Sequence, residues 1–284
     1  MNAAEAHRSL PRSILAPVLC RWLRTGGFLF RDILYPPFCI LCHQPTLARA
    51  APATPPLCSN CTDAAQRLRL PVLRPPASST PPFLPQAENA ALCWQCSRPF
   101  SGAQPLPARC ADCVQRNPAF QNALATHRTA GVIRELLHRF KYEGNPFLAL
   151  PLASWLAESL QDERLRSPLP EVLVPVPLHW WKKWRRGFNQ ADLLARQLHK
   201  LSGIPLEPLL RRIRDTGSQT ALRREDRLHN LERAFQIRSR SVVSGRHVLL
   251  IDDVLTTGAT LDGCARELHR AGAASVRALA VARG

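Results

Sequence analysis

The sequence predicts an α/β protein with a mostly parallel sheet flanked by helices, preceded by a small cysteine-rich domain. From residue 123 onward, apolar runs of strand length alternate with amphipathic helical segments. Eight of the ten cysteines lie earlier, between Cys39 and Cys113. The 284 residues are 45% hydrophobic, enough for one large domain and an accessory one. We expect an N-terminal segment (residues 1–35), a double cysteine region (36–118) with a Pro-rich linker (62–92), and an α/β domain (119–284).

The N-terminal segment is apolar over residues 14–34 but carries four charges. Such charges are costly in a bilayer, and no small-residue cleavage site follows a clean apolar run. Apolar residues at helical spacing between Leu15 and Leu23 predict an amphipathic helix that packs on the protein itself. We therefore expect a cytoplasmic protein without stable membrane insertion, whose oligomeric state the sequence does not indicate.

The cysteine region contains four CxxC pairs in two groups. A CxxC turn brings two thiolates to the separation that one edge of a tetrahedral zinc site needs, and two such turns complete a shell of four thiolates. The spacing predicts two structural zinc ions, one for each consecutive group of four. The expected ligands are Cys39, Cys42, Cys58 and Cys61 in the first group, and Cys93, Cys96, Cys110 and Cys113 in the second.

Other uses of these thiols are less favoured. Disulfides require an oxidising compartment, a thioredoxin-like pair would occur singly, and an iron–sulfur cluster remains chemically possible with the same ligands. The proline-rich linker makes interleaved pairing of the two groups the less simple arrangement. His43 is at best a spare ligand, and Cys20 and Cys264 are expected to be packed thiols.

The α/β domain is predicted element by element from its apolar pattern. Helices are expected over residues 131–142, from Asn189 to about residue 201, and over residues 261–271. Strands are expected over residues 172–177, 247–251 and 275–282, of which the run 247–251 is continuously apolar, as in a strand buried on both faces. The polar stretch 211–233 is expected to form a flap that closes over a site.

The turn after Ile251 has the composition of a site for a phosphorylated ribose. Parallel sheets bind ligands at the carboxyl ends of their strands. Asp252 and Asp253 suit the two ribose hydroxyls and can help to hold Mg²⁺ through water. The residues that bring hydroxyls and backbone N–H groups to a helix N-terminus, where anions bind, are Thr256, Thr257, Gly258, Ala259 and Thr260. No GxxxxGK[ST] loop or dinucleotide fingerprint occurs.

The net charge of +17 favours anionic partners, although an Arg-rich solvated surface explains it equally well. Lys182, Lys183, Arg185 and Arg186 follow the strand at 172–177, and they suit a pyrophosphate group or a nucleic-acid backbone. Tryptophans at positions 180, 181 and 184 interleave with these charges, an arrangement suited to stacking on single-stranded bases or, equally, to packing on the domain.

Residues 248–260, VLLIDDVLTTGAT, resemble the phosphoribosyl pyrophosphate motif of type I phosphoribosyltransferases. Residues 174–191, VPVPLHWWKKWRRGFNQA, are similar to the signature of the ComF-type family, and segments 140–142 and 214–235 agree. The resemblance implies a type I phosphoribosyltransferase fold behind a double zinc ribbon. It implies phosphoribosyl pyrophosphate with Mg²⁺ as ligand, Asp252 and Asp253 at the ribose, Arg185 or Arg186 at the pyrophosphate, and a role in DNA uptake during natural transformation.

Three functions are consistent with these features. The first is a phosphoribosyltransferase (a glycosyltransferase acting by pentosyl transfer). The second is a non-catalytic competence protein that binds single-stranded DNA or protein partners of the uptake machinery. The third is a sensor that binds phosphoribosyl pyrophosphate without transferring anything. Thr256 stands where 6-oxopurine phosphoribosyltransferases have an aspartate, which argues against salvage of hypoxanthine or guanine.

Overall fold

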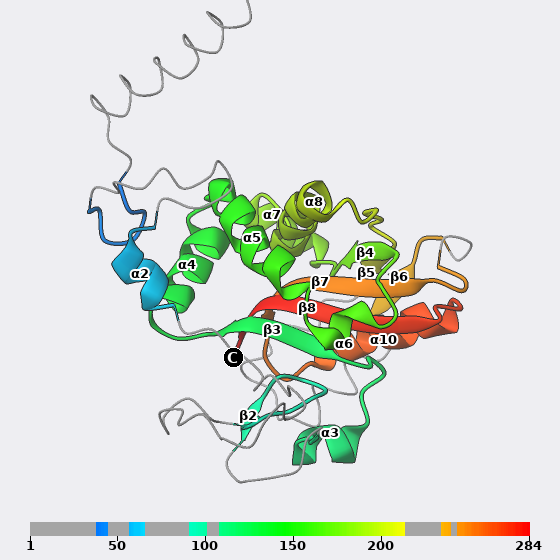
Figure 1. The fold of residues 1–284 in the computed structure, drawn as a ribbon. Helices are drawn as coiled ribbons and strands as arrows, with labels where there is room; N and C mark the ends of the chain where they lie inside the picture. The colour runs from blue at the N-terminus through cyan, green and yellow to red at the C-terminus, as the bar shows by residue number, and fades with distance from the viewer. Residues whose placement is uncertain (1–37, 45–56, 66–90, 101–107, 214–233, 240–242) are drawn as a thin grey trace, which may run out of the picture.

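The computed structural model describes residues 38–44, 57–65, 91–100, 108–213, 234–239 and 243–284. The expected N-terminal amphipathic helix, Cys20, most of the Pro-rich linker and most of the expected flap lie outside the described residues. Four parallel strands form the central sheet in the order β3 (Ala123–Arg128), β8 (Ser275–Arg283), β7 (His247–Leu255) and β4 (Val172–Pro175). Figure 1 shows this sheet in the middle of the molecule, with helices above and below it.

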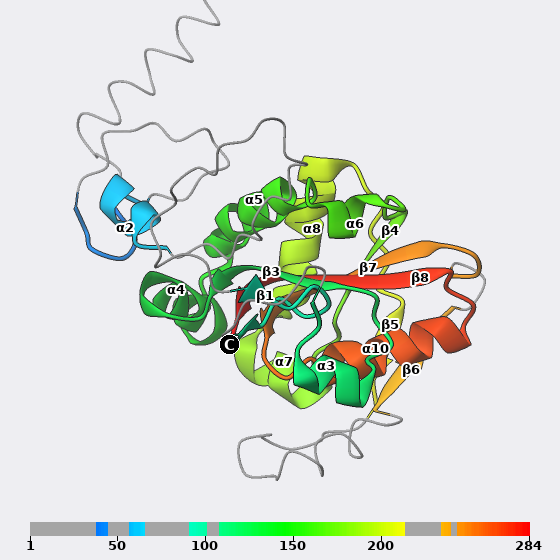
Figure 2. The same ribbon diagram turned by 60° about the horizontal axis from the view of Figure 1, so that its bottom comes forward.

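Helices cover both faces of the sheet because its strands are apolar on both sides. The upper face in Figure 1 carries α4 (Gly131–Tyr142), α5 (Ala149–Ser159) and α8 (Gln190–Ser202). Side chains such as Leu173 and Leu249 join their core. The opposite face carries α10 (Ala259–Arg270), and Val174 and Leu250 point into this second core. Figure 2, turned by 60°, shows α10 on the side of the sheet away from α5 and α8.

The cysteine region supplies the smaller elements at the start of the chain. The first cysteine group includes α2 (Ser59–Asp63). The second lies in what we call the cysteine module, residues 91–100 and 108–118, with β1 (Ala91–Leu92) paired to β2 (Pro99–Phe100) and with α3 (Ala111–Arg116). Its cysteines belong to the same hydrophobic core as α10. The module therefore packs on the sheet face that α10 covers.

The remaining described elements are short. They are the 3₁₀ turn η1 (Pro146–Leu148), α6 (Glu163–Arg166), α7 (Trp180–Arg186), and the antiparallel pair β5 (Leu210–Arg212) and β6 (Phe235–Ile237). The start of the expected flap is thus a strand, β5, and its remainder lies outside the described residues. Within the described ranges, no helix is long and apolar enough to cross a membrane.

The helices predicted for the α/β domain are confirmed, with boundaries close to those expected. The helix expected over 131–142 is α4, and the helix expected to begin at Asn189 is α8, whose first turn is capped by the Asn189 side chain accepting from the Ala191 N–H at 3.2 Å. The helix expected over 261–271 is α10, and its five expected apolar residues are all buried. The last strand, β8, matches the run 275–282 to within one residue.

Two strand boundaries differ from the sequence expectation. Strand β4 ends at Pro175, two residues before the expected end. Strand β7 does not end at Ile251 but continues to Leu255, because its pairing with β8 extends through Asp252↔Ala280 and Leu255↔Arg283. The two aspartates therefore lie on a hydrogen-bonded strand rather than in a turn. This places their side chains on a regular backbone near the carboxyl end of an inner strand of the sheet.

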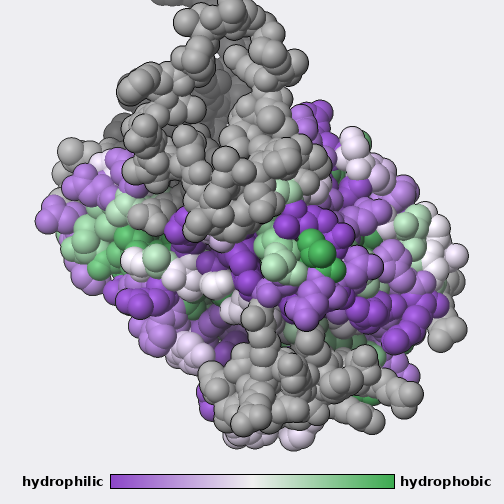
Figure 3. Space-filling model, turned by 90° about the horizontal axis from the view of Figure 1, so that it is seen from below, coloured by the Kyte–Doolittle hydropathy of each residue, from purple (hydrophilic) through white to green (hydrophobic). Residues whose placement is uncertain are grey.

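The face of the molecule seen from below is mostly hydrophilic where its residues are described. Seen from below in Figure 3, purple residues dominate and the green apolar patches are small and separate. This agrees with the net charge of +17. A few large apolar side chains are nevertheless strongly exposed, among them Trp180 at 69% and Trp184 at 78%, both on α7.

Candidate functional site

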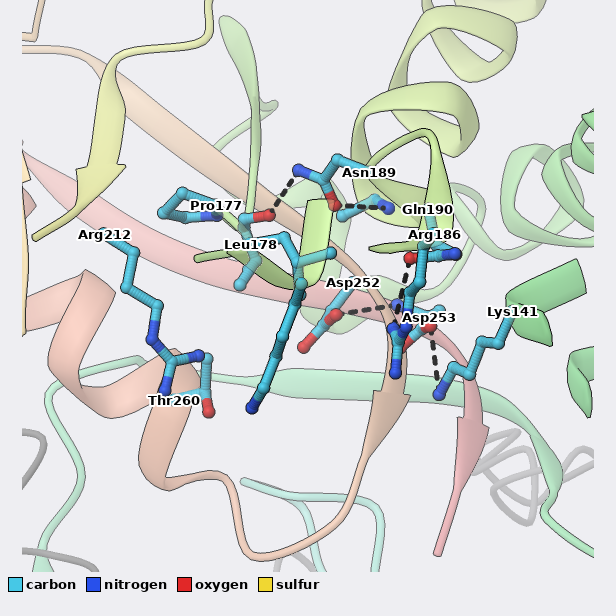
Figure 4. A pocket seen from close by; sticks show the side chains of 13 residues that line it. Lys141, Pro177, Leu178, Arg186, Asn189, Gln190, Arg212, Asp252, Asp253 and Thr260 are labelled. Atoms are coloured by element: carbon cyan, nitrogen blue, oxygen red, sulfur yellow. Dashed lines mark hydrogen bonds and ion pairs between the residues drawn. The ribbon is translucent and has the colours of Figure 1, made fainter. Parts of the chain in front are cut away.

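A cavity of about 260 Å³ opens at the carboxyl ends of β4 and β7. Six segments contribute to its wall: α4, the stretch after β4, helix α7, the start of α8, strand β5, and the end of β7 with the first turn of α10. The lining residues are Lys141, Val176, Pro177, Leu178, Lys182, Arg186, Asn189, Gln190, Ala191, Arg212, Asp252, Asp253 and Thr260. Figure 4 shows the two aspartates in the middle, between Arg212 and Thr260 on one side and Arg186 and Lys141 on the other.

The paired aspartates are the anionic part of this cavity. Asp253 Oδ2 lies 3.0 Å from Nζ of Lys141, which comes from the last turn of α4. Asp252 Oδ1 accepts the Asp253 backbone N–H at 2.8 Å. Burial of the Asp252 carboxyl, together with the neighbouring charge of Asp253, raises its pKa from 3.8 to about 8. Such a pair is stabilised by ligands that donate hydrogen bonds, such as ribose hydroxyls, or by a cation.

Cationic side chains form the opposite part of the cavity. Arg186 reaches it from the end of α7, where Nη1 donates to Gln190 Oε1 at 3.3 Å and the guanidinium lies 5.1 Å from the centre of the Tyr142 ring. Lys182 and Arg212 also line the wall. Arg185 does not: its guanidinium lies over Trp181, 5.4 Å from the ring centre, on the exposed side of α7. Arg186 can therefore contact an anionic ligand in the cavity, whereas the Arg185 side chain points away from the cavity.

The connection from β4 to α8 is held in shape by Asn189. Its Nδ2 donates to the Val176 carbonyl at 3.0 Å while its Oδ1 caps α8. Gly187 ends α7 in the left-handed region at φ 80°, a conformation that glycine adopts without strain. Asn189 and Gly187 thus set the direction of the chain between α7 and α8, and in this arrangement Lys182 and Arg186 of α7 line the cavity.

The phosphate loop, residues 256–260, joins β7 to α10. Gly258 is the N-cap of α10 and has φ 78°, so it occupies the left-handed region. A Cβ at this position would lie 3.4 Å from the Phe120 ring, which leaves little room for a larger residue. Thr260 in the first turn of α10 lines the cavity, whereas Thr256, Thr257, Gly258 and Ala259 lie beyond its wall. Of the five residues expected to bind the phosphate, only Thr260 therefore lines the cavity, and the other four lie next to it in the chain at the α10 N-terminus, where backbone N–H groups favour an anion.

The eight CxxC cysteines form the two expected groups of four. Within each group the sulfur atoms lie within 4.8 Å of one another. Hydrogen bonds from the Cys113 and Cys96 thiols hold the pKa of Cys93 well below its usual range. Burial alone would raise the pKa of Cys39, but backbone hydrogen bonds from Cys42 and Cys58 outweigh it and lower that pKa to about 6. Burial and the Cys58 thiol raise the pKa of Cys61 in the same group, so a lowered pKa is not shared by all eight cysteines. Four sulfur atoms gathered this closely match the tetrahedral shell that zinc prefers. Both groups therefore fit a structural zinc ion, paired consecutively as the spacing predicts.

Comparison with known proteins places this site in a family. Residues 184–284 match the domain described as "Phosphoribosyl transferase domain", which includes the end of α7, β7, the phosphate loop and α10. Competence protein F of Haemophilus influenzae is 32% identical over 202 residues, which cover 70% of this chain and 87% of that protein. The chain belongs to the ComF family. Two further relatives agree.

The DNA utilization protein YhgH of Salmonella typhi is 35% identical to this ComF-family chain over 67% of the chain and 83% of that protein. Competence protein ComFC of Bacillus subtilis is 32% identical over 68% of the chain and 78% of that protein. The resemblance seen in the sequence is therefore confirmed, as is the α/β phosphoribosyltransferase fold behind a cysteine-rich zinc-ribbon region.

The structure brings together only part of the residue set expected from the sequence. Asp252, Asp253, Arg186 and Thr260 share the ComF cavity, whereas Arg185 lies outside it. Sequence reasoning gave no ligand role to Lys141, Gln190 or Arg212. Only the position of Lys141 within the family segment 140–142 could have indicated it. Arg212 lay at the start of the expected flap, and its place in the wall depends on the β5–β6 pairing, which no local pattern reveals.

Proposed function

We propose that this ComF-family chain binds phosphoribosyl pyrophosphate with Mg²⁺ in the cavity, transfers its phosphoribosyl group to a nucleophile, and acts in DNA uptake. One observation carries the proposal. Two adjacent carboxylates and Thr260 of the first turn of α10 line one cavity, and cationic side chains line it as well. Phosphoribosyl pyrophosphate carries hydroxyls between two anionic ends, so its chemistry matches this order of groups.

Each part of the ligand has a counterpart in the cavity. Asp252 and Asp253 accept hydrogen bonds from the ribose hydroxyls, and the phosphate loop receives the 5-phosphate at the α10 N-terminus. Arg186 and Lys182 pair with the pyrophosphate. The carboxylate oxygens of the aspartates suit Mg²⁺, which when bound neutralises charge on the leaving group. An incoming nucleophile forms a bond to the anomeric carbon while the bond from that carbon to the pyrophosphate oxygen breaks.

Isothermal titration with phosphoribosyl pyrophosphate and Mg²⁺ tests the binding. The native protein is expected to bind, and the double variant Asp252→Asn/Asp253→Asn is expected to lose most of its affinity. Asp192→Asn is the matched control, because Asp192 pairs with Arg196 on the surface of α8, outside the cavity wall. Absence of binding by the native protein contradicts the proposal, and so does unchanged affinity of the double variant.

Catalysis is tested separately, by screening nucleophiles for release of pyrophosphate. We expect at least one nucleobase or amine to give release that depends on Mg²⁺ and is lost in the double variant. Binding without release for every nucleophile would identify the chain as a sensor of the same ligand. The cavity and its charges do not distinguish among acceptors, so the screen is broad.

The names of the relatives support a role in DNA uptake, since two are competence proteins and one is a DNA utilization protein. A Haemophilus influenzae strain lacking Competence protein F provides the test. The native chain is expected to restore transformation, and Asp252→Asn/Asp253→Asn is expected not to restore it although it accumulates to the same level. Equal rescue by the native chain and the double variant would show that the role in DNA uptake does not depend on the two aspartates of the cavity.

A second candidate function, binding of single-stranded DNA, is favoured by α7. Its exposed Trp180 and Trp184 stand among four cationic side chains with no acidic residue in the helix. Aromatic faces stack on bases and cations pair with phosphates. Trp180→Ala/Trp184→Ala is expected to weaken oligothymidylate binding at least tenfold, with affinity falling steeply with salt. Phe147→Ala removes an aromatic ring that is 84% exposed on η1 and is expected to change nothing. Equal affinities of the two variants contradict this candidate.

A further inference from the structure

The carbonyl groups of the phosphate loop and the residue before it are bound from one side by arginines. The Leu255 carbonyl accepts from Arg283 Nη1 at 2.8 Å and from the Gly284 N–H at 2.9 Å. The Thr256 carbonyl also accepts from Arg283 Nη1. The Thr257 carbonyl accepts from Arg116 Nη2 at 2.9 Å. Three consecutive carbonyls are thus fixed by two guanidinium groups.

One of these guanidinium groups belongs to the cysteine module, and the other lies on β8 near its thiols. Arg116 is the last residue of α3, the helix that has Cys110 as its N-cap and contains Cys113. Arg283 is only 6% exposed, and burial lowers the pKa of its guanidinium while the nearby Cys96 and Cys110 thiols act in the opposite direction. A further contact follows immediately in the chain, where the Ala119 N–H donates to Asp262 Oδ1 in the first turn of α10 at 2.6 Å. The cysteine module therefore holds the loop and the helix start together.

Peptide geometry turns these contacts into an orientation for the ligand-binding groups. In a planar trans peptide the carbonyl and the following N–H point in opposite directions. Carbonyls of Leu255, Thr256 and Thr257 that face the module therefore leave the N–H groups of Thr256, Thr257 and Gly258 facing away from it. Within the part of the chain that the structure describes, none of these three N–H groups donates to a backbone carbonyl. They remain available for an anion at the α10 N-terminus.

We propose that the second cysteine group, with its zinc, is a positioning device for the phosphate loop, and that Arg116 and Arg283 are the positioning residues that transmit its order to the loop. The inference rests on the proposed function. A zinc ion bound by four thiolates has a net charge of about −2. This charge attracts the Arg283 guanidinium to the side of the loop that faces the cysteine module. The zinc then serves more than the folding of its own module: it presets the N–H groups that receive the 5-phosphate.

The first cysteine group provides the internal control. Its described contact with the α/β domain runs to α4, where Arg139 Nη1 donates to the Ile40 carbonyl. Its apolar neighbours pack against the core on the other face of the sheet, with α4, α5 and α8. In the described residues no hydrogen bond joins it to the phosphate loop. Loss of its zinc should therefore leave the loop unchanged.

The primary test uses Arg116→Ala in the zinc-loaded full chain, because Arg116 is only half-buried and its loss spares the core. Backbone ¹⁵N relaxation of the ligand-free protein is measured at Thr256, Thr257 and Gly258. The native loop is expected to be as ordered as β7, with an order parameter of about 0.85, and the variant is expected to fall below about 0.6. Affinity for phosphoribosyl pyrophosphate is expected to fall about tenfold at unchanged zinc content.

Two matched variants sharpen this test. Arg116→Lys keeps a cation at the Thr257 carbonyl and is expected to restore much of the order and the affinity. Arg270→Ala removes an exposed arginine from the far end of α10 and is expected to have no effect. Native order parameters in Arg116→Ala would overturn the inference. Because they are measured without ligand, they decide it even if the native protein proves not to bind phosphoribosyl pyrophosphate.

The zinc itself is tested by comparing Cys96→Ser with Cys61→Ser. Each variant is expected to lose one zinc ion, but only Cys96→Ser is expected to disorder residues 256–258 and weaken binding. Equal effects of the two variants on the loop would overturn the assignment to the second group. If Cys96→Ser fails to fold, the Arg116 series still decides the inference.

Discussion

At the scale of single residues, the main feature of the site is that few cationic groups neutralise the carboxylates of Asp252 and Asp253. Lys141 is the one cation that the described residues bring into an ion pair with them, at 3.0 Å from Asp253. Asp252 is left with a buried carboxyl beside a like charge, which raises its pKa to about 8. The apo protein therefore carries an electrostatic cost at the same position where a ligand would relieve it.

This cost predicts a pH-dependent stability. Because the pKa of Asp252 is higher in the folded than in the unfolded chain, the folded state binds the extra proton between pH 3.8 and about 8, and the contribution of Asp252 to stability falls as pH rises through that window. Asp252→Asn removes this loss. Its melting temperature relative to the native protein should be higher at pH 9 than at pH 5, as measured by circular dichroism. The same relative value at both pH values would contradict the raised pKa.

Two neighbouring arginines should differ in their effect on ligand binding. Arg186 lines the cavity, whereas Arg185 lies over Trp181 on the exposed side of α7. A charge-assisted hydrogen bond contributes about 1.5–3 kcal/mol, so Arg186→Ala is expected to weaken binding of phosphoribosyl pyrophosphate by about tenfold or more. Arg185→Ala serves as the control and should keep native affinity by titration calorimetry. A larger loss in Arg185→Ala would mean that α7 rotates on binding.

At the scale of elements, the sequence predicts the helices that show hydrophobic periodicity. It does not predict strand segments whose extent is set by pairing with a distant strand. The helices α4, α8 and α10 follow from apolar residues at helical spacing. The end of β7 does not, because Asp252 and Asp253 are polar and only the pairing with β8 keeps them extended. Strand β5 is likewise set by its partner β6, which follows a polar stretch of more than twenty residues. Arg212 reaches the cavity wall for this reason alone.

The turn from β7 to α10 should be sensitive to a single methyl group. Gly258 has φ 78°, and a Cβ there would contact the Phe120 ring at 3.4 Å. Gly258→Ala is therefore expected to cost about 1 kcal/mol or more in stability and to weaken phosphate binding, because alanine is strained at this φ and the nearby Phe120 ring limits how the loop can relax. Gly203→Ala is the control: it also has a positive φ, of 75°, but open space around it. Denaturant unfolding and calorimetry measure both. Equal losses in both variants would show that backbone strain alone is responsible.

At the scale of the whole molecule, the boundary at residues 118/119 separates segments that share one core. Cys93, Cys96, Cys110 and Cys113 belong to the same buried cluster as Leu250 and Leu268. The module also covers the outer edge of the sheet, where the Ala123 N–H donates to the Gln95 carbonyl at 2.6 Å and Ser97 Oγ donates to the Ala123 carbonyl at 3.0 Å. The CxxC spacing predicts the zinc groups, but it carries no information about the surface on which they pack.

We therefore propose that the second cysteine group and the α/β domain form one folding unit. The fragment 91–284 is expected to be soluble with one zinc ion and to bind phosphoribosyl pyrophosphate as the full chain does. The fragment 119–284 exposes part of a hydrophobic core and the edge of β3, so it is expected to aggregate or to unfold at much lower denaturant concentration. Sedimentation and urea unfolding of the two fragments test this. Equal stability of the two fragments would show that residues 119–284 fold as a separate domain.

The position of β8 between β3 and β7 also has a kinetic consequence. Among the described strands, β3 pairs with β8 alone, and a hydrogen bond between Thr126 and Val281 joins residues 155 positions apart. Contacts of such long sequence separation form slowly, because the entropy of closing a large loop opposes them. During synthesis, β3 and the thiols next to it must wait for β8 to emerge. Early zinc capture would protect those thiols during this interval, so zinc supply should influence the yield of folded protein as well as its final stability.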